Sequence, residues 1–182
     1  MPVRLLFVCY ENICRSPMAE GAFLHLSTLR GTYPFFEVES AGTVCYQAGS
    51  SPDPRAVRVA QRHGIDIAPI RARCIHDIDL DKFDRVFAMD AENYHDLLNV
   101  LDNSRVRVHM MSDFTVSGQG SEVEDPYYGS EADFERTMKR LMHCAEGILS
   151  ALQEEYGIFP DERPGSDEGK TVQYSDYGGR QQ

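Results

Sequence analysis

The sequence predicts a single α/β domain whose four-stranded parallel sheet, in strand order 2-1-3-4, carries helices on both faces, a flavodoxin-like topology. Three observations lead to this prediction. The chain has 182 residues, enough for one full core and too few for two comfortable ones. Its first apolar run is short and nearly continuous, as in a parallel strand covered on both faces. Finally, a strand-like segment followed by a helix-like segment occurs four times.

The first strand–helix unit opens the chain. Residues 3–8 form the apolar run, and a tight polar loop follows it. Ser16 stands where a helix N-cap is expected, and Pro17 would take the first helical position. The next apolar residues recur at helical spacing: Ala22, Phe23, Leu26 and Leu29. The polar loop therefore lies at the carboxyl end of a strand, where parallel α/β sheets bind their ligands.

Three further units follow in chain order. They are predicted as a strand at 35–40 with a helix at 53–62 ended by Gly64, a strand at 85–89 with a helix at 92–101, and a strand at 106–111 with a long amphipathic helix at 131–156. We expect the folded domain to span residues 1–157. Residues 158–182 are rich in Gly, Pro and charge and poor in aliphatic side chains, which predicts a disordered tail.

Composition excludes several classes of function. The formal net charge of −11 argues against a surface for nucleic acid or anionic membranes, since both need clustered Lys and Arg. No apolar run approaches the length of a membrane span, and no export signal is evident, so we expect a soluble, cytoplasmic protein. The six histidines show no metal-ligand spacing, and we propose neither a metal nor a cofactor.

The five cysteines are odd in number and lack the paired short spacings of zinc sites or secreted disulfide frameworks. We therefore expect reduced thiols. Cys45, Cys74 and Cys144 are interpreted as structural residues.

The segment Cys9-Tyr-Glu-Asn-Ile-Cys-Arg-Ser-Pro17 carries the clearest chemistry. A loop between a strand and a helix can turn its backbone N–H groups inward around an anion, and the same groups stabilise a thiolate at Cys9. Arg15 can offer two parallel N–H donors to phosphoryl oxygens, and the Ser16 hydroxyl is placed to donate to the Cys9 sulfur. Of the five cysteines only Cys9 has Arg six residues later. The alternative is a buried structural cysteine in a β–α turn.

Asp125-Pro126-Tyr127-Tyr128 is a candidate for a second catalytic element. Release of an ester oxygen from phosphorus requires a proton, which a carboxylic acid near the anion loop can supply. The two tyrosines could wall a slot for a flat ring. An Asp-Pro pair also commonly starts a turn, and that reading remains open.

Together these residues resemble the low-molecular-weight protein tyrosine phosphatase family over residues 3–152. The signature loop reads CYENICRSP at 9–17 and the acid motif reads DPYYG at 125–129, and four shorter stretches also match: 40–43, 53–55, 63–65 and 83–90. The resemblance implies hydrolysis of phosphotyrosine in proteins, and of small aryl phosphates, through a phosphocysteine intermediate. Cys9 would be the nucleophile, Arg15 would bind the phosphoryl group, and Asp125 would act as general acid and then base.

The resemblance also assigns supporting roles. Asn12 would hold the loop through Ser40, Ser16 would assist the thiolate, and Tyr46 would stand where the family often places a substrate-facing aromatic. Cys14 would form a protective disulfide with Cys9 as a redox partner, or else be a small buried side chain. The residues expected to bind substrate are Tyr10, Glu11, Asn12, Ile13, Cys14, Ser16, Tyr46 and Tyr127.

The chain departs from the family pattern at two positions. Glu11 replaces the usual Gly at the rim of the anion site, and Ile70 stands where many members carry a His that supports Asn12. Some members favour phosphoarginine and carry Thr where this chain has Ile13, so the branched side chain favours the aryl ester.

Two other functions remain open, an arsenate reductase of the same fold and a non-catalytic phosphotyrosine-binding module. Arsenate reductases relay a disulfide through two further cysteines on a nearby segment, where this chain has Cys74 only. We expect phosphotyrosine-containing proteins as partners, and a monomer. A tyrosine kinase that phosphorylates Tyr174 and Tyr177 of the tail is a further candidate partner.

Overall fold

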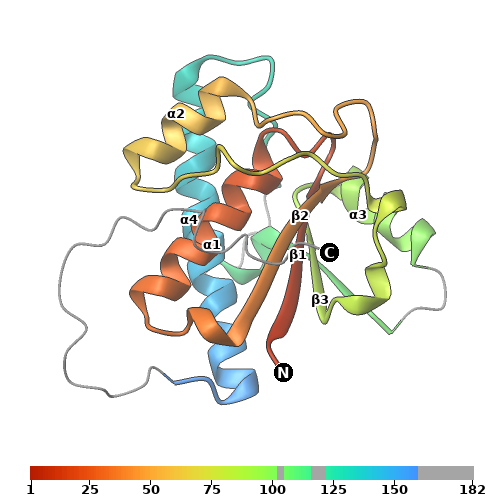
Figure 1. Cartoon of the computed structure of the whole chain (residues 1–182), viewed down its shortest axis with the longest axis vertical. Helices are drawn as coiled ribbons and strands as arrows, with labels where there is room; N and C mark the ends of the chain where they lie inside the picture. The colour runs from red at the N-terminus through yellow and green to blue at the C-terminus, as the bar shows by residue number, and fades with distance from the viewer. Residues whose placement is uncertain (102–104, 116–121, 160–182) are drawn as a thin grey trace.

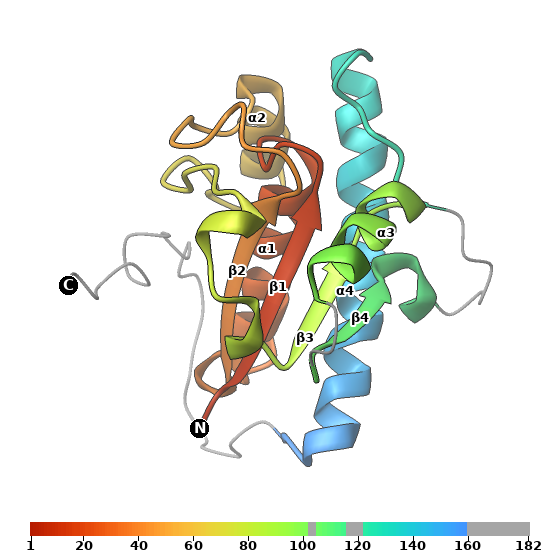
Figure 2. The same ribbon diagram turned by 90° about the vertical axis from the view of Figure 1, so that its right-hand side faces the viewer.

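The computed structural model describes residues 1–101, 105–115 and 122–159. Its sheet has four strands, all parallel, in the order β2-β1-β3-β4, and Figure 2 shows them side by side in this order. The strands are β1 (Val3–Cys9), β2 (Phe36–Gly42), β3 (Arg85–Ala88) and β4 (Arg107–Met110). The predicted fold class and strand order are confirmed.

The α-helices are α1 (Arg15–Leu29), α2 (Pro54–Arg62), α3 (Ala91–Val100) and α4 (Glu131–Tyr156). Short 3-10 helices span η1 (Tyr33–Phe35), η2 (Ile75–Asp77), η3 (Leu80–Lys82) and η4 (Met111–Phe114). Helices α1, α2 and α4 lie on one side of the sheet and α3 lies on the other (Figure 1). The loop that follows β1 therefore emerges between two covered faces, at the carboxyl edge of the sheet.

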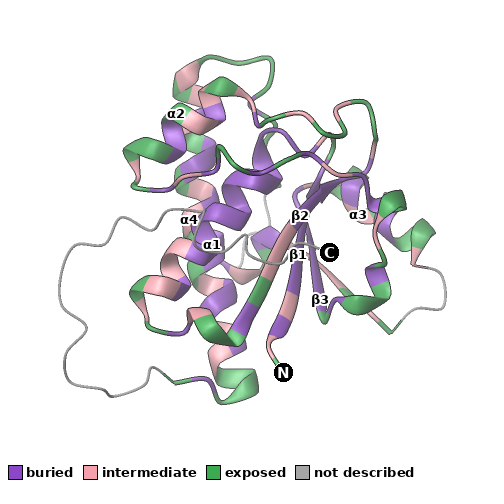
Figure 3. Ribbon diagram, viewed as in Figure 1, coloured by how far each residue is buried: buried purple, intermediate pink, exposed green. Residues whose placement is uncertain are grey.

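Strand β1 supplies the centre of both cores, which explains its continuous apolar sequence. Leu5 and Phe7 belong to the cluster under α1 and α4, whereas Leu6 and Val8 belong to the cluster under α3. Phe7 stacks on Phe87 of β3 with ring centroids 5.3 Å apart. In Figure 3 the buried residues gather on β1, β3 and α1. Each such side chain contributes about 1.5–3 kcal/mol through burial, so β1 is a rigid base for the loop.

Two helices agree with the predicted ranges 53–62 and 131–156 to within one residue at each end. Asp53 is the N-cap of α2, and its carboxylate accepts a hydrogen bond from the Arg55 N–H at 2.8 Å. Gly157 ends α4 in the left-handed conformation with φ 63°. Ile158, just beyond the predicted domain end at residue 157, is buried in the core. The rest of the predicted tail, including Tyr174 and Tyr177, lies outside the described residues.

The start of α1 differs from the prediction. The helix begins at Arg15 with Cys14 at its N-cap position, and no side chain caps it. Ser16 is therefore not the N-cap. Its hydroxyl is buried inside the first turn and faces the Cys9 sulfur. Because the helix begins one residue before Ser16, the Ser16 hydroxyl does not cap the helix and can hydrogen-bond to Cys9 instead.

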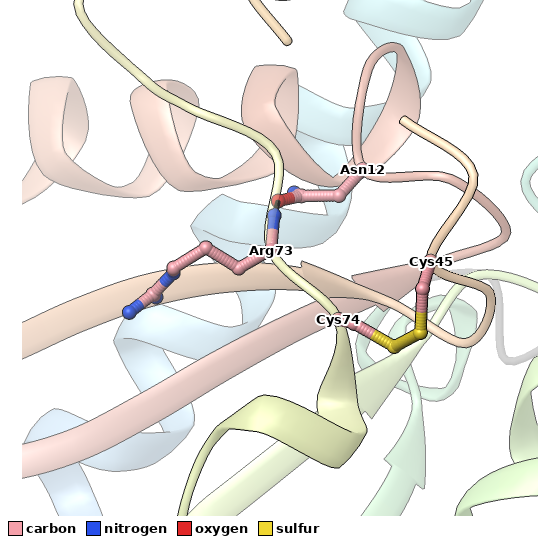
Figure 4. The surroundings of a disulfide bond; sticks show 4 residues. All are labelled: Asn12, Cys45, Arg73 and Cys74. Carbon is pink, nitrogen blue, oxygen red and sulfur yellow. Dashed lines mark hydrogen bonds between the residues drawn. A yellow bond between two sulfur atoms is a disulfide. The ribbon is translucent and has the colours of Figure 1, made fainter. Parts of the chain in front are cut away.

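The prediction of reduced thiols is wrong for two of the five cysteines. Cys45 and Cys74 form a disulfide (Figure 4). They are 29 residues apart in sequence, and a β-bridge between Gly42 and Cys74 brings the two segments together. Cys9, Cys14 and Cys144 are free and buried. Burial raises the pKa of Cys144 to about 11, consistent with a packing role in α4.

Within the described part of the chain, no helix combines the length and apolarity that a bilayer crossing requires.

Candidate active site

The loop between β1 and α1 (residues 9–15, the anion loop) places Cys9 at the floor of a cavity. Cys9 ends β1 and is almost fully buried. Its Sγ lies 3.0 Å from the Ser16 Oγ, in the geometry expected for a hydroxyl that stabilises a thiolate. The nucleophile candidate and its hydrogen-bond partner are thus held by a buried strand and by the first turn of a helix.

Asn12 holds the middle of the anion loop in a left-handed conformation with φ 58°. Its Nδ2 donates to Ser16 Oγ at 2.8 Å and to Ser40 Oγ at 2.9 Å. Its Oδ1 accepts a hydrogen bond from the backbone N–H of Arg73 at 2.9 Å. These three hydrogen bonds offset a conformation that is costly for a non-glycine residue. Ile70 is buried in the core, and none of these three hydrogen bonds of Asn12 involves a histidine.

Arg15 is the buried charge at the centre of the site. Its side chain is 3% exposed, and it donates to Asp90 Oδ2 at 2.6 Å, to the Val123 carbonyl at 3.0 Å and to Asp125 Oδ2 at 2.9 Å. Burial lowers the pKa of Arg15, but the charges of Cys9, Asp125 and Asp90 outweigh it and raise the pKa above its ordinary value. Arg15 is therefore a permanent cation at the cavity wall.

Asp90 is a site residue that the sequence reasoning did not single out. Its Oδ2 pairs with Arg15, and its Oδ1 accepts a hydrogen bond from the Asn93 N–H at the start of α3. Its position could have indicated a role in the site. Asp90 closely follows β3, which neighbours β1 in the sheet, and it directly precedes a helix. An acidic residue at that edge of the sheet can reach the anion loop. Asp90 thus holds the Arg15 guanidinium in place through its Nη1 atom.

We expect Asp90→Asn to lower kcat/KM about tenfold. The amide oxygen can keep the helix cap, but the amide nitrogen that replaces Oδ2 is a donor and cannot accept from Arg15. The lost hydrogen bond between charged groups is worth about 1.5–3 kcal/mol, and its lower end corresponds to about tenfold. Steady-state kinetics on an aryl phosphate measure the change. Glu92→Gln, an exposed position in the first turn of α3, is the matched control. An unchanged kcat/KM in Asp90→Asn would reduce Asp90 to a helix cap.

The cavity above Cys9 has a volume of about 130 Å³. Its lining consists of Cys9, Tyr10, Glu11, Ile13, Cys14, Arg15, Asp125, Tyr127 and Tyr128. Asn12, Ser16 and Ser40 are buried outside this lining and act as support. Tyr46 is not part of the lining, and it is 82% exposed. Tyr128 lines the cavity although it was not among the predicted binding residues.

Asp125 and its two tyrosines form the mouth of the cavity. One Asp125 carboxylate oxygen accepts from the Tyr127 N–H at 3.1 Å while the other pairs with Arg15. The Asp125 side chain is 44% exposed, so solvent reaches it. The rings of Tyr127 and Tyr128 are 5.0 Å apart in an edge-to-face arrangement. The Arg55 guanidinium packs over the Tyr127 ring, which supports that wall.

Cys14 shares the cavity with Cys9. Burial, with a smaller contribution from the charge of Cys9, raises the pKa of the Cys14 thiol well above its usual range. Cys14 therefore stays a neutral thiol beside the nucleophile candidate.

Comparison with known proteins gives a consistent set of matches. The family model described as low molecular weight phosphotyrosine protein phosphatase matches residues 4–157. The low molecular weight phosphotyrosine protein phosphatase of Sus scrofa is 36% identical over 152 residues, which are 82% of this chain and 95% of that protein. A putative low molecular weight protein-tyrosine-phosphatase of Synechocystis is 36% identical over 155 residues, 84% of this chain and 98% of that protein.

Solved structures agree with these matches. A protein tyrosine phosphatase from Entamoeba histolytica, with Hepes in its active site, superposes with a TM-score of 0.76 at 33% identity and covers 85% of this chain and 99% of that chain. YfkJ from Bacillus subtilis gives a TM-score of 0.76 at 32% identity, with 85% and 97% covered.

Proposed function

The chain belongs to the low molecular weight phosphotyrosine protein phosphatase family and is a protein tyrosine phosphatase, and on this premise we propose how its residues divide the reaction. Cys9 is the nucleophile, Arg15 binds the phosphoryl group, and Asp125 is general acid and then base. The observation that carries this assignment is their meeting in one cavity, with the Cys9 sulfur at its floor beside Ser16.

In the first step the Cys9 thiolate attacks phosphorus, so that a P–S bond forms as the P–O bond to the phenol breaks. Arg15 is held by Asp90 on one side and by Asp125 on the other. The phosphoryl dianion takes the place of Asp125 at the Arg15 fork while Asp90 keeps its hold. Asp125, released from Arg15, takes up a proton from the solvent that reaches its partly exposed carboxylate, and then transfers this proton to the departing phenolic oxygen.

In the second step a water molecule replaces the phenol. Asp125, now ionised, accepts a proton from this water as its oxygen attacks phosphorus. The P–S bond breaks, the electron pair returns to Cys9, and inorganic phosphate leaves. The Ser16 hydroxyl, 3.0 Å from the sulfur, stabilises the thiolate as it reforms.

The walls of the cavity suit a flat aromatic ester. Ile13 provides an apolar contact in the anion loop, and Tyr10, Tyr127 and Tyr128 provide rings around the mouth. We infer that phosphotyrosine in proteins is the substrate and that Ile13 disfavours phosphoarginine. Tyr46 is exposed and outside the cavity lining, and we infer that it contacts the protein around the phosphotyrosine rather than its ring.

Hydrolysis of an aryl phosphate, with and without vanadate, tests the proposed function. We expect turnover that vanadate inhibits competitively, a lower rate on phosphoarginine, and no thiol-dependent reduction of arsenate. Cys74 is bonded to Cys45 rather than positioned as a relay for Cys9. Arsenate reduction without phosphatase turnover would contradict the proposal.

We expect Glu11→Gly to lower KM about threefold at low salt, with a smaller gain at high salt. Glu11 is one of the residues that line the cavity entered by a phosphate dianion, and salt screens exposed charges. Glu11→Gln is the matched variant, because it removes the charge and keeps the size. An unchanged KM in both variants would show that the carboxylate does not act on the substrate.

We expect Cys14→Ser to start active but to recover poorly after peroxide. In the wild type, peroxide oxidises Cys9 to a sulfenic acid, and the Cys14 thiol condenses with it to a disulfide and water. A dithiol then restores activity. Without Cys14, oxidation proceeds to sulfinic or sulfonic acid, which mass spectrometry detects on the peptide that contains Cys9. Recovery of Cys14→Ser as complete as that of the wild type would make Cys14 a packing residue.

We infer that the enzyme works as a monomer in the cytoplasm and that a tyrosine kinase acting on its tail is a partner. The nucleophile works only as a reduced thiol, which a reducing compartment maintains.

A further inference from the structure

The disulfide between Cys45 and Cys74 lies beside the anion loop without being part of it (Figure 4). Two segments carry it. We call residues 42–50 the bridge loop and residues 70–74 the strap. Each segment is hydrogen-bonded to the other, and each also contacts the anion loop.

The bridge loop is paired on both of its edges. On one edge Thr43 N–H donates to the Cys9 carbonyl at 2.9 Å, and Val44 N–H donates to the Tyr10 carbonyl at 3.0 Å. On the other edge Gly42 N–H donates to the Arg73 carbonyl and Gly49 N–H to the Ala72 carbonyl, each at 2.8 Å. The backbone of the bridge loop is therefore hydrogen-bonded to the anion loop on one edge and to the strap on the other.

The strap also contacts the anion loop directly. The Arg73 N–H donates to Asn12 Oδ1 at 2.9 Å, and Figure 4 shows the Asn12 side chain pointing at the backbone of Arg73, next to Cys74. The Arg73 peptide thus uses its N–H for Asn12 and its carbonyl for Gly42. Any shift of the strap away from the bridge loop pulls on the residue that keeps the anion loop in its left-handed turn.

Contact between the bridge loop and the anion loop is close enough to transmit such a shift. A Cβ atom on Gly42 would lie 2.7 Å from the Tyr10 carbonyl oxygen and 3.0 Å from the Asn12 nitrogen. The two backbones are therefore packed at the limit that glycine allows. Packed layers at this distance move together rather than independently.

Of the two cysteines in the disulfide, only Cys45 is accessible to a reductant in solution. Cys45 is exposed, whereas Cys74 is completely buried. An Asp77 carboxylate oxygen lies within 4.8 Å of both sulfur atoms. A small dithiol can reach the Cys45 sulfur, while the buried side of the bond remains in place beside the strap.

We propose that the Cys45–Cys74 disulfide is a redox-sensitive clamp that positions Asn12, so that its reduction weakens phosphoryl binding at the anion loop. The inference rests on the proposed function of that loop. Reduction by a dithiol breaks the Sγ–Sγ bond and leaves two thiols on the protein. The dithiol supplies both electrons and both protons and leaves as its own disulfide.

The enzyme would then have two cysteine pairs, Cys9 with Cys14 and Cys45 with Cys74, whose oxidation has opposite effects on activity. Oxidation of Cys9 by peroxide blocks the nucleophile, whereas oxidation of the Cys45 and Cys74 pair tightens the loop around it. Activity is then highest when the first pair is reduced and the second is oxidised. Strong reductants used to protect Cys9 would lower the affinity for substrate.

The test uses the Cys9→Ser chain, which removes turnover and nucleophile oxidation from the measurement. Its affinity for inorganic phosphate is measured by calorimetry in the disulfide form and after reduction by a dithiol, with the state of Cys45 verified by thiol labelling. We expect reduction to weaken phosphate binding about fivefold, the size of one net hydrogen bond. The matched control, Cys9→Ser with Cys45→Ser, should bind phosphate weakly with or without dithiol.

A second readout separates positioning from overall stability. In the enzyme with Cys9 intact, Cys45→Ser should raise KM about fivefold and change kcat less than twofold, since Arg15 and Asp125 are untouched. Hydrogen exchange at the Arg73 amide should accelerate with the same substitution. A kcat loss without a KM change would overturn the clamp, as would phosphate affinity that is independent of the redox state.

Two other outcomes have distinct meanings. Failure of Cys9→Ser to bind phosphate in either redox state would remove the proposed function together with the clamp. Zinc that binds the reduced protein stoichiometrically and restores its phosphate affinity would overturn the disulfide clamp. It would instead assign Cys45, Cys74 and Asp77 to a metal site.

Discussion

Cys9→Ser should turn over phosphotyrosine at less than about 1% of the wild-type rate. A serine hydroxyl is not ionised at neutral pH, so the anion loop has no nucleophilic anion to stabilise. The Ser16 hydroxyl, which lies 3.0 Å from the Cys9 sulfur, then has no thiolate to stabilise by a hydrogen bond. Stopped and continuous assays on phosphotyrosine and on an aryl phosphate measure the loss.

Cys144→Ser is the control for Cys9→Ser, because Cys144 is another free, buried thiol and does not line the cavity. It should keep its kcat/KM. Phosphate binding should survive in Cys9→Ser, since Arg15 and the backbone of the loop remain. Residual turnover of several per cent in Cys9→Ser, after correction for wild-type contamination, would contradict the covalent mechanism.

The second large effect is expected at Asp125. Asp125→Asn should slow phosphotyrosine hydrolysis by on the order of 10² to 10⁴, because the departing phenolate then leaves without a proton. An ester of a more acidic phenol needs no such proton and should lose far less rate in its first step. The comparison therefore requires both substrates, measured under single-turnover conditions.

The ion pair between Asp125 and Arg15 adds a second expectation for this variant. In the free enzyme the Asp125 carboxylate competes with phosphate for the Arg15 fork. Removal of its charge should leave phosphate affinity equal to the wild type or higher. Equal rate losses on the two esters, together with weaker phosphate binding, would reassign Asp125 to a structural role.

Much of the fold was predictable because local signals and packing agree. A continuous apolar run predicted β1, and the helices predicted at 53–62 and 131–156 agree with α2 and α4 to within one residue at each end. Chemistry confined to one short segment was predictable for the same reason. Cys9 and Arg15 are fixed relative to each other by a single strand–loop–helix unit.

Features that depend on distant segments were not predictable in the same way. The Cys45–Cys74 disulfide joins residues 29 positions apart, and only the backbone pairing around Gly42 reveals it. Asp90 reaches Arg15 because β3 adjoins β1, a relation that spacing along the chain does not contain. Ser16 looked like a helix cap because its residue type favours caps, but the loop enters α1 earlier and uses its hydroxyl.

Trapping of the phosphoenzyme tests the central claim most directly. With Asp125→Asn and an ester of an acidic phenol, the first step proceeds while the second lacks its base, so the intermediate should accumulate. Rapid quenching and mass spectrometry should place one phosphoryl group on Cys9. A quenched enzyme that carries no phosphoryl group, or carries it on a residue other than Cys9, would contradict the account.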